Sequence, residues 1–146
     1  MLIQKQILLV EDNSDDELLT IRALKKNNIA NDIIVARDGA EALDFLFGVD
    51  GHRKLIHLPT LIILDLNLPK IDGLEVLKKL KADAQTKLIP VVVLTSSDEQ
   101  KDMLASYGLG ANSYIRKPVD FNKFIEVAAN IGLYWLVMNE LPESTT

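Results

Sequence analysis

Five short apolar runs constrain the fold of this chain most, because few polar residues interrupt them. They are rich in Val, Ile and Leu, and they lie at Ile7–Val10, Ile33–Ala36, Leu61–Leu64, Val91–Leu94 and, more weakly, Ser113–Ile115. A strand with one face in water alternates apolar and polar residues, whereas a strand buried on both faces does not. The runs therefore predict a parallel sheet that helices cover on both sides.

Amphipathic segments follow the runs and predict the covering helices. Ser14 and Glu17 have the spacing of a capping box, which favours a first helix from about Asp15. Four more helices are expected at Gly39–Phe47, Asp72–Ala82, Asp98–Tyr107 and Asp120 to about Met138. Strands that alternate with helices, joined by right-handed crossovers, predict an α/β fold. We expect a doubly wound five-stranded parallel sheet with the flavodoxin-like strand order 2-1-3-4-5.

Length and composition limit the alternatives. The chain has 146 residues, which predicts one domain over residues 1–140 and a flexible tail over residues 141–146. The net charge of −5 and the lack of a basic cluster argue against a nucleic-acid partner. No signal peptide precedes the first run, and no apolar stretch approaches the roughly 20 residues that span a bilayer. We therefore expect a cytoplasmic protein without a membrane partner.

Acidic residues follow two strands that should be neighbours in this sheet. Glu11 and Asp12 come directly after the first strand, and Asp65 follows the third. Carboxyl ends of parallel strands meet at one edge, so the three carboxylates should converge there. Such a cluster suits Mg²⁺, which prefers oxygen ligands, and the backbone carbonyl of Asn67 could complete the protein ligands. A plain helix-capping role is as good a reading for Glu11 and Asp12 taken alone, and it is the favoured one for Asp15 and Asp16.

A hydroxyl and an ammonium stand at the ends of the last two strands. Thr95 ends the fourth strand and Lys117 follows the fifth. Each alone could be a helix cap or a surface cation. Together with the acids, they can bind two oxygens of a phosphoryl group carried by Asp65, while Mg²⁺ binds the third. Asp65 would then be the nucleophile that forms an acyl phosphate.

These residues lie in motifs that resemble the receiver domains of two-component response regulators. The motifs are ILLVEDN, LIILDLNLPKIDGLEVL, VVVLTSS and SYIRKP, in the order of that family and spanning about Ile7 to Met138. The resemblance implies a phosphoprotein rather than an enzyme, with Asp65 as phosphoacceptor, Mg²⁺ on Glu11, Asp12, Asp65 and the Asn67 carbonyl, and phosphoryl contacts from Thr95 and Lys117. It also implies that Tyr114 responds to Thr95 on phosphorylation, and that the protein dephosphorylates itself slowly.

A narrower resemblance concerns the partner. The long connection after the second helix, the run SYGLGANSYIRKPVDF and the final GLYWLVMN are similar to the small response regulators of cyanobacterial bacteriophytochromes. The implied partner is a sensor histidine kinase of the phytochrome type, which would signal through this protein by protein–protein contacts.

The last helix carries more apolar residues than one buried face can use. The run Ile131–Met138 is almost wholly apolar, and its candidate contact residues are Leu133, Tyr134, Trp135, Leu136, Val137 and Met138. An exposed patch of this kind marks an interaction surface, and a symmetric pair is the commonest oligomer. We expect a homodimer through this helix, although the helix end could instead fold under the loop Gly48–Pro59.

Other functions fit the pattern less well. A phosphatase with Asp65 as nucleophile would usually carry that residue on its first strand, with a second Asp two positions later, where this chain has Asn67. A flavin-binding module would need a phosphate-binding loop after the first strand, and the acidic loop here repels phosphate. A degenerate receiver that acts as a scaffold is a further alternative.

Overall fold

A computed structural model describes residues 6–26, 32–48, 55, 57–96 and 99–117, together with residues 122, 123, 126 and 130. The strands are β1 (Gln6–Val10), β2 (Asp32–Ala36), β3 (Leu61–Leu64), β4 (Val91–Thr95) and β5 (Ser113–Arg116). The helices with described bounds are α1 (Ser14–Lys26), α2 (Gly39–Phe47), α3 (Gly73–Ala82) and α4 (Gln100–Gly108). Each predicted strand is present, within one residue of its expected ends.

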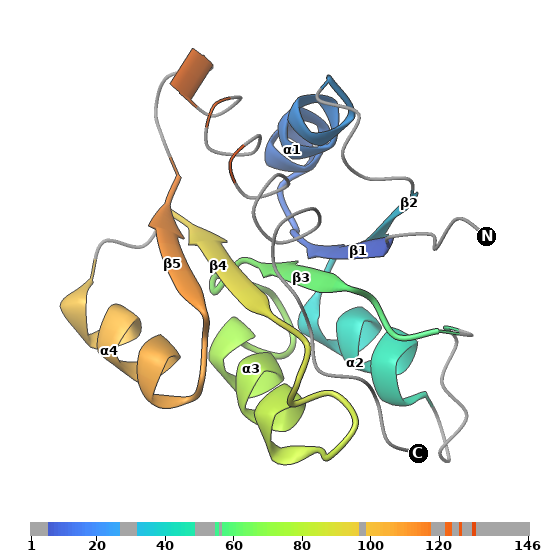
Figure 1. The fold of residues 1–146 in the computed structure, drawn as a ribbon. Helices are drawn as coiled ribbons and strands as arrows, with labels where there is room; N and C mark the ends of the chain where they lie inside the picture. Colours follow the sequence, from blue (N-terminus) through green and yellow to red (C-terminus); the bar gives the residue numbers. More distant parts are fainter. Residues whose placement is uncertain are drawn as a thin grey trace.

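The five strands form one parallel sheet with the order β2-β1-β3-β4-β5. This order confirms the predicted doubly wound topology. It places β1 beside β3, with Val10 level with Leu64, so the residues that follow these two strands emerge at the same edge. Figure 1 shows this edge at the arrowheads of the strands.

The central strands β1, β3 and β4 are buried on both faces, as the apolar runs predict, whereas the edge strands β2 and β5 are mostly half-buried. One face packs Leu8, Ile62 and Val93 against the buried side chains of α2 and α3. The other face packs Ile7, Ile63 and Val92 against Ala23 and Leu24 of α1. Figure 1 shows α1 on the opposite side of the sheet from α2 and α3. Because alternate residues of a strand point to opposite faces, each central strand contributes to both halves of the core.

The start of α1 differs from the sequence prediction. Asn13, rather than Ser14, caps the helix, because its Oδ1 accepts the backbone N–H groups of Asp15 and Asp16 at 3.0 Å each. Glu17 does not close a capping box with Ser14; its carboxylate lies 3.0 Å from Nε of Arg37. The sequence offered two adjacent residues that both favour a cap, and the backbone uses the first.

α2 has its predicted bounds, whereas the starts of α3 and α4 shift. α3 begins at Gly73 because Asp72 is its N-cap and accepts the N–H of Leu74 at 2.9 Å. α4 begins at Gln100, two residues later than expected, and its N-cap Glu99 makes no side-chain cap hydrogen bond. Because no side chain caps α4, the acidic residues before it do not predict the residue at which the helix begins.

The last predicted helix lies mostly outside the described residues. Asn122, Lys123, Glu126 and Asn130 are helical and exposed, which agrees with a helix in this region. The candidate contact residues 133–138 and the tail 141–146 are among the residues that the structure does not describe. No helix in the described part of the chain is both long enough and apolar enough to cross a membrane.

Candidate functional site

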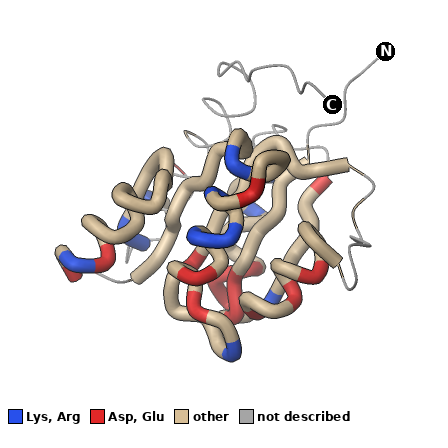
Figure 2. The backbone as a smooth tube through the Cα atoms, turned by 90° about the horizontal axis from the view of Figure 1, so that it is seen from below, with Lys and Arg blue, Asp and Glu red and all other residues tan. Residues whose placement is uncertain are grey.

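Four of the predicted site residues, Glu11, Asp12, Asp65 and Lys117, come together at the carboxyl edge of the sheet. Asp65 continues the β3 backbone, and its N–H donates to the carbonyl of Val10 at 3.0 Å. The N–H of Lys117 donates to the carbonyl of Thr95 at 2.7 Å. The sheet hydrogen bonding thus extends one residue beyond the strands and fixes the backbone of both residues. Figure 2 shows several acidic positions gathered at one end of the molecule.

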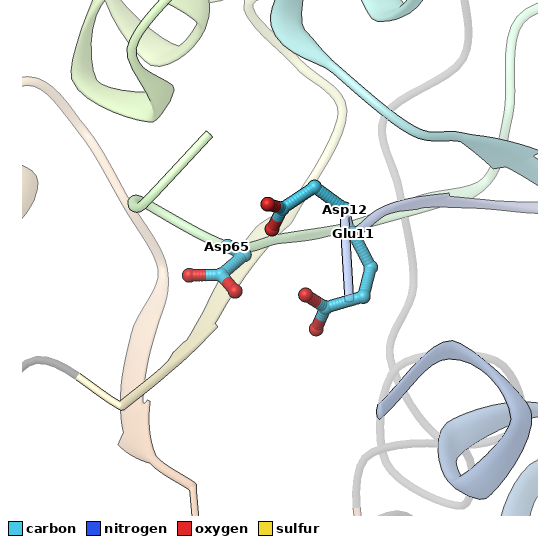
Figure 3. Close-up of side chains that lie close together, drawn as sticks. All are labelled: Glu11, Asp12 and Asp65. Atoms are coloured by element: carbon cyan, nitrogen blue, oxygen red, sulfur yellow. The ribbon is translucent and has the colours of Figure 1, made fainter. Parts of the chain in front are cut away.

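Three carboxyl groups form the centre of the site. Glu11, Asp12 and Asp65 each offer an oxygen, and these oxygens all lie within 4.8 Å of one another. Figure 3 shows the three groups turned toward a common space. Glu11 and Asp65 are 2% and 4% exposed, whereas Asp12 is exposed to solvent. Two buried acids and one exposed acid with converging oxygens fit a hard divalent cation that keeps part of its water shell.

Lys117 is the cation of this cluster. Its Nζ lies 2.6 Å from Oε1 of Glu11, 2.9 Å from Oδ2 of Asp65 and 2.8 Å from Oδ2 of Asp16. The lysine side chain is 9% exposed. A lysine ammonium has three N–H donors, so three carboxylates satisfy it fully. The prediction of a phosphoryl-binding lysine therefore has the geometry it needs, since Lys117 reaches Asp65 directly.

The protonation states follow from burial and these contacts. Burial raises the pKa of Glu11 to about 8, Asp65 adds to the rise, and Lys117 partly offsets it. Burial also acts to raise the pKa of Asp65, but hydrogen bonds from Glu11, Lys117 and the Asn67 N–H leave that pKa below its usual value. The two pKa shifts have opposite directions, so the carboxyl group of Asp65 ionises before that of Glu11. Asp65 remains ionised, as a nucleophile requires.

The surroundings of Lys117 keep it charged. Burial acts to lower the pKa of Lys117, but hydrogen bonds to Asp16, Glu11 and Asp65 outweigh burial and raise it. The site therefore holds a permanent positive charge beside Asp65. Such a charge can stabilise the added negative charge of a phosphoryl group.

The turn after β3 holds Asp65 and Asn67 in a compact arrangement. The Asn67 N–H donates to Oδ1 of Asp65 at 3.1 Å, and the Gly73 N–H donates to the Leu66 carbonyl at 3.1 Å. A side chain at Gly73 would overlap the carbonyl oxygen of Asp65. Asn67 therefore lies beside Asp65, and the role of its carbonyl as a metal ligand stays a prediction.

Thr95 and Tyr114 share a face of the sheet. Tyr114 is half-buried and packs against the core on the α2 and α3 side. Thr95 is fully buried and follows Val91 and Val93, which belong to the same core, at even spacing. Val93 is level with Tyr114 in the sheet register. The predicted hydroxyl and aromatic residue are thus on neighbouring strands and on the same side.

Asp16 is the site residue that sequence reasoning missed. Its position in the first turn of α1 favoured a role at the helix start. In the structure its carboxylate instead binds Lys117, which lies 101 residues away along the chain. Local sequence carries no signal for this contact, because Asp12 lies before the start of α1 and Lys117 is distant along the chain.

Comparisons with known proteins identify the family of this chain. The response regulator receiver domain matches residues 7–129. Response regulator Rcp1 of Synechocystis sp. is 42% identical over 138 residues, which cover 94% of this chain and 93% of Rcp1. A probable methanogenesis regulatory protein of Methanothrix harundinacea, FilR2, is 40% identical over 136 residues, which cover 93% of this chain and 86% of FilR2.

Solved structures lead to the same family. The phosphorylated cyanobacterial phytochrome response regulator RcpA superposes with a TM-score of 0.89 at 39% identity, over 97% of this chain and all of RcpA. The Mn²⁺-bound form of Rcp1 gives a TM-score of 0.84 at 40% identity, over 95% of this chain and 99% of Rcp1. Neither the phosphatase nor the flavin alternative is favoured by these matches. By sequence and by structure, the chain belongs to the response regulator receiver domain family.

Proposed function

We propose that Asp65 accepts a phosphoryl group from a sensor histidine kinase. An ionised oxygen of Asp65 attacks the phosphorus of a phosphohistidine, a P–O bond forms, and the P–N bond breaks to release the histidine. The observation that carries this proposal is the contact of 2.9 Å between Oδ2 of Asp65 and the Lys117 ammonium. It pairs a buried nucleophile with a fixed cation at the edge where doubly wound sheets bind their ligands.

A divalent cation completes the proposed reaction, and Mg²⁺ is the candidate. Glu11, Asp12 and Asp65 would hold it, and the carbonyl of Asn67 would add a fourth protein oxygen. When bound, the ion would neutralise negative charge on the phosphoryl oxygens. The support from this chain is the convergence of three carboxylate oxygens within 4.8 Å. Oxygen donors of this kind suit Mg²⁺ and Mn²⁺ alike, and the related Rcp1 has been solved with Mn²⁺.

Lys117 and Thr95 would bind the transferred group. The ammonium of Lys117 already lies at Asp65, and the hydroxyl of Thr95 ends the adjacent strand. Thr95 and Tyr114 share one face of the sheet, so a shift of the hydroxyl toward the phosphoryl group would change the space open to the aromatic ring. We infer that this change carries the signal. Water attack on the same phosphorus would later release inorganic phosphate and regenerate Asp65.

We propose a phytochrome-type histidine kinase as the phosphoryl donor. The support is the 39% identity to RcpA, a cyanobacterial phytochrome response regulator. FilR2 is 40% identical and is associated with methanogenesis, so overall identity does not separate these two kinds of partner. The residues on the surface that contacts the kinase, rather than those of the phosphorylation site, would determine which kinase is the partner.

Phosphotransfer assays test this proposal directly. A phytochrome histidine kinase loaded with labelled phosphate should transfer its label to the wild-type chain and to Asp15→Asn, but not to Asp65→Asn. Transfer to Asp65→Asn would refute the choice of nucleophile. Equal transfer from kinases that do not belong to phytochromes would refute the specific partner while leaving the phosphoacceptor in place.

We also propose a homodimer through residues 133–138. The proposal rests on the apolar run in the sequence, because these residues lie outside the described part of the chain. Trp135→Ala should lower the molecular mass measured by light scattering. An unchanged mass would place the dimer contact elsewhere or show a monomer.

A further inference from the structure

Asp16 has a carboxylate that the start of its helix does not need. The cap of α1 is supplied by Asn13, whose Oδ1 accepts the N–H groups of both Asp15 and Asp16. Glu17, the next acid, lies 3.0 Å from Arg37 at its Oε1. Of the three acids in this first turn, Asp16 is the one that turns to Lys117, with Oδ2 at 2.8 Å from Nζ.

The three carboxylates around Lys117 have different fates during phosphorylation. Glu11 and Asp65 belong to the set of converging oxygens that suits a metal ion. Asp65 also receives the phosphoryl group in the proposed reaction. Asp16 lies outside that set, and its side chain is 33% exposed, so it has neither role. It is the contact of Lys117 that can persist when the other two acids change partners.

We propose that Asp16 is a positioning residue for Lys117. It anchors the ammonium while Glu11 and Asp65 engage a metal ion and a phosphoryl group, and it leaves two of the three lysine N–H donors for phosphoryl oxygens. This inference rests on the proposed function of Asp65 and names a further residue for that reaction. A long flexible lysine side chain loses much rotamer freedom when fixed, so an anchor lowers the cost of ordering it at the moment of transfer.

The effect of losing this anchor can be given a scale. A hydrogen bond to a charged group contributes more than a neutral one, but a partner that is one-third exposed contributes less than a buried one. We expect Asp16→Asn to slow phosphorylation by acetyl phosphate at saturating Mg²⁺ by about 3- to 10-fold. Asp16→Glu should recover most of the rate, because it restores the charge with a reach only one methylene longer. Asp15→Asn, an exposed acid in the same turn, should match the wild type.

A second measurement reports directly on the position of the Lys117 ammonium. It distinguishes loss of this positioning from a general structural effect and from failure of the proposed function. Side-chain ¹H–¹⁵N NMR of the Mg²⁺-saturated protein, recorded cold, should give a signal for Lys117 Nζ that is protected from exchange in the wild type. That signal should broaden or vanish in Asp16→Asn and return in Asp16→Glu. The measurement needs no phosphorylation. If the wild type itself takes up no phosphoryl group, the proposed function fails, and the NMR result alone still judges whether Asp16 holds the lysine.

The outcomes decide the proposal. Loss of the Lys117 signal together with a slower rate in Asp16→Asn, both recovered in Asp16→Glu, supports it. A protected Lys117 signal in Asp16→Asn overturns it, because the other two acids would then suffice to hold the lysine. A lost signal with an unchanged phosphorylation rate also overturns it, because the anchor would have no effect on transfer.

Discussion

The ammonium nitrogen of Lys117 lies 2.6 Å from Oε1 of Glu11, although one residue follows the last described strand and the other follows the first. This contact places the lysine among the same oxygens that suit a metal ion. In the metal-free protein Lys117 therefore neutralises the acids, and a bound cation would have to share or displace it. Metal binding, lysine position and the protonation of Glu11 are thus linked.

The affinity for Mg²⁺ should rise with pH. Burial raises the pKa of Glu11 to about 8, and a metal ligand must lose its proton to bind. Below that pH each bound ion therefore releases one proton, and the dissociation constant should fall by up to about tenfold per pH unit until the carboxylate is ionised. Calorimetric titrations between about pH 6 and about pH 9 would measure this. Glu11→Gln should bind more weakly and lose most of the dependence; a wild-type affinity that does not change over this range would contradict the protonated Glu11.

Removal of the Lys117 charge should destabilise the metal-free protein. Lys117→Ala leaves Glu11 and Asp65 buried beside each other without their cation, which typically costs about 3 kcal/mol of unfolding free energy. Added Mg²⁺ should recover much of that loss, because it supplies positive charge to the same oxygens. Urea unfolding with and without Mg²⁺ measures both quantities. Lys101→Ala is the matched control, since Lys101 forms an exposed ion pair with Glu99 and should change stability by less than about 1 kcal/mol.

The turn before α3 contains a strained residue. Lys70 has a φ of 67°, in the left-handed region that favours glycine, and its ammonium lies 3.3 Å from Asp38. Lys70→Gly and Lys70→Ala both remove that ion pair, so comparing them isolates the backbone effect. Lys70→Gly should be more stable than Lys70→Ala by about 1 kcal/mol in thermal or urea unfolding. Equal stabilities would show that the turn relaxes when the lysine is removed.

Gly39 is required by close packing at the start of α2. A side chain at this position would overlap the carbonyl oxygen of Ile71, which belongs to the turn that follows Asp65. Gly39→Ala should therefore reduce stability by about 2–3 kcal/mol, as overpacking against backbone does. Gly108→Ala, where nothing lies within 4 Å of an added methyl group, is the control and should be neutral or slightly stabilising. Similar stabilities for the two variants would contradict the close approach.

The sequence predicted the sheet and most of the site for a physical reason. Runs such as Leu61–Leu64 are buried on both faces. An apolar run of this kind predicts a buried strand from its own residues, without information from the rest of the chain. Parallel topology then brings their carboxyl ends together, which is why Glu11, Asp65 and Lys117 could be grouped before any distance was known.

The parts that were missed depend on choices that local sequence does not make. Asn13 and Ser14 are both good caps, and the path of the backbone selects Asn13. Acidic residues such as Asp16 are common in the first turn of a helix. The partner of Asp16, Lys117, is far away along the chain. The late start of α4 follows from a cap position, Glu99, whose side chain makes no cap hydrogen bond. The roles of Thr95 and Tyr114 in signalling stay predictions, as does the dimer contact at residues 133–138.

Intact-mass spectrometry after incubation with acetyl phosphate tests the central claim most directly. With Mg²⁺ present, the wild-type chain should gain one phosphoryl group, and it should gain none after the metal is removed with a chelator. Asp65→Asn should gain none under either condition, because it lacks the carboxylate oxygen that attacks phosphorus. An adduct of the same size on Asp65→Asn, or its mapping by fragmentation to another residue of the wild type, would contradict Asp65 as the phosphoacceptor.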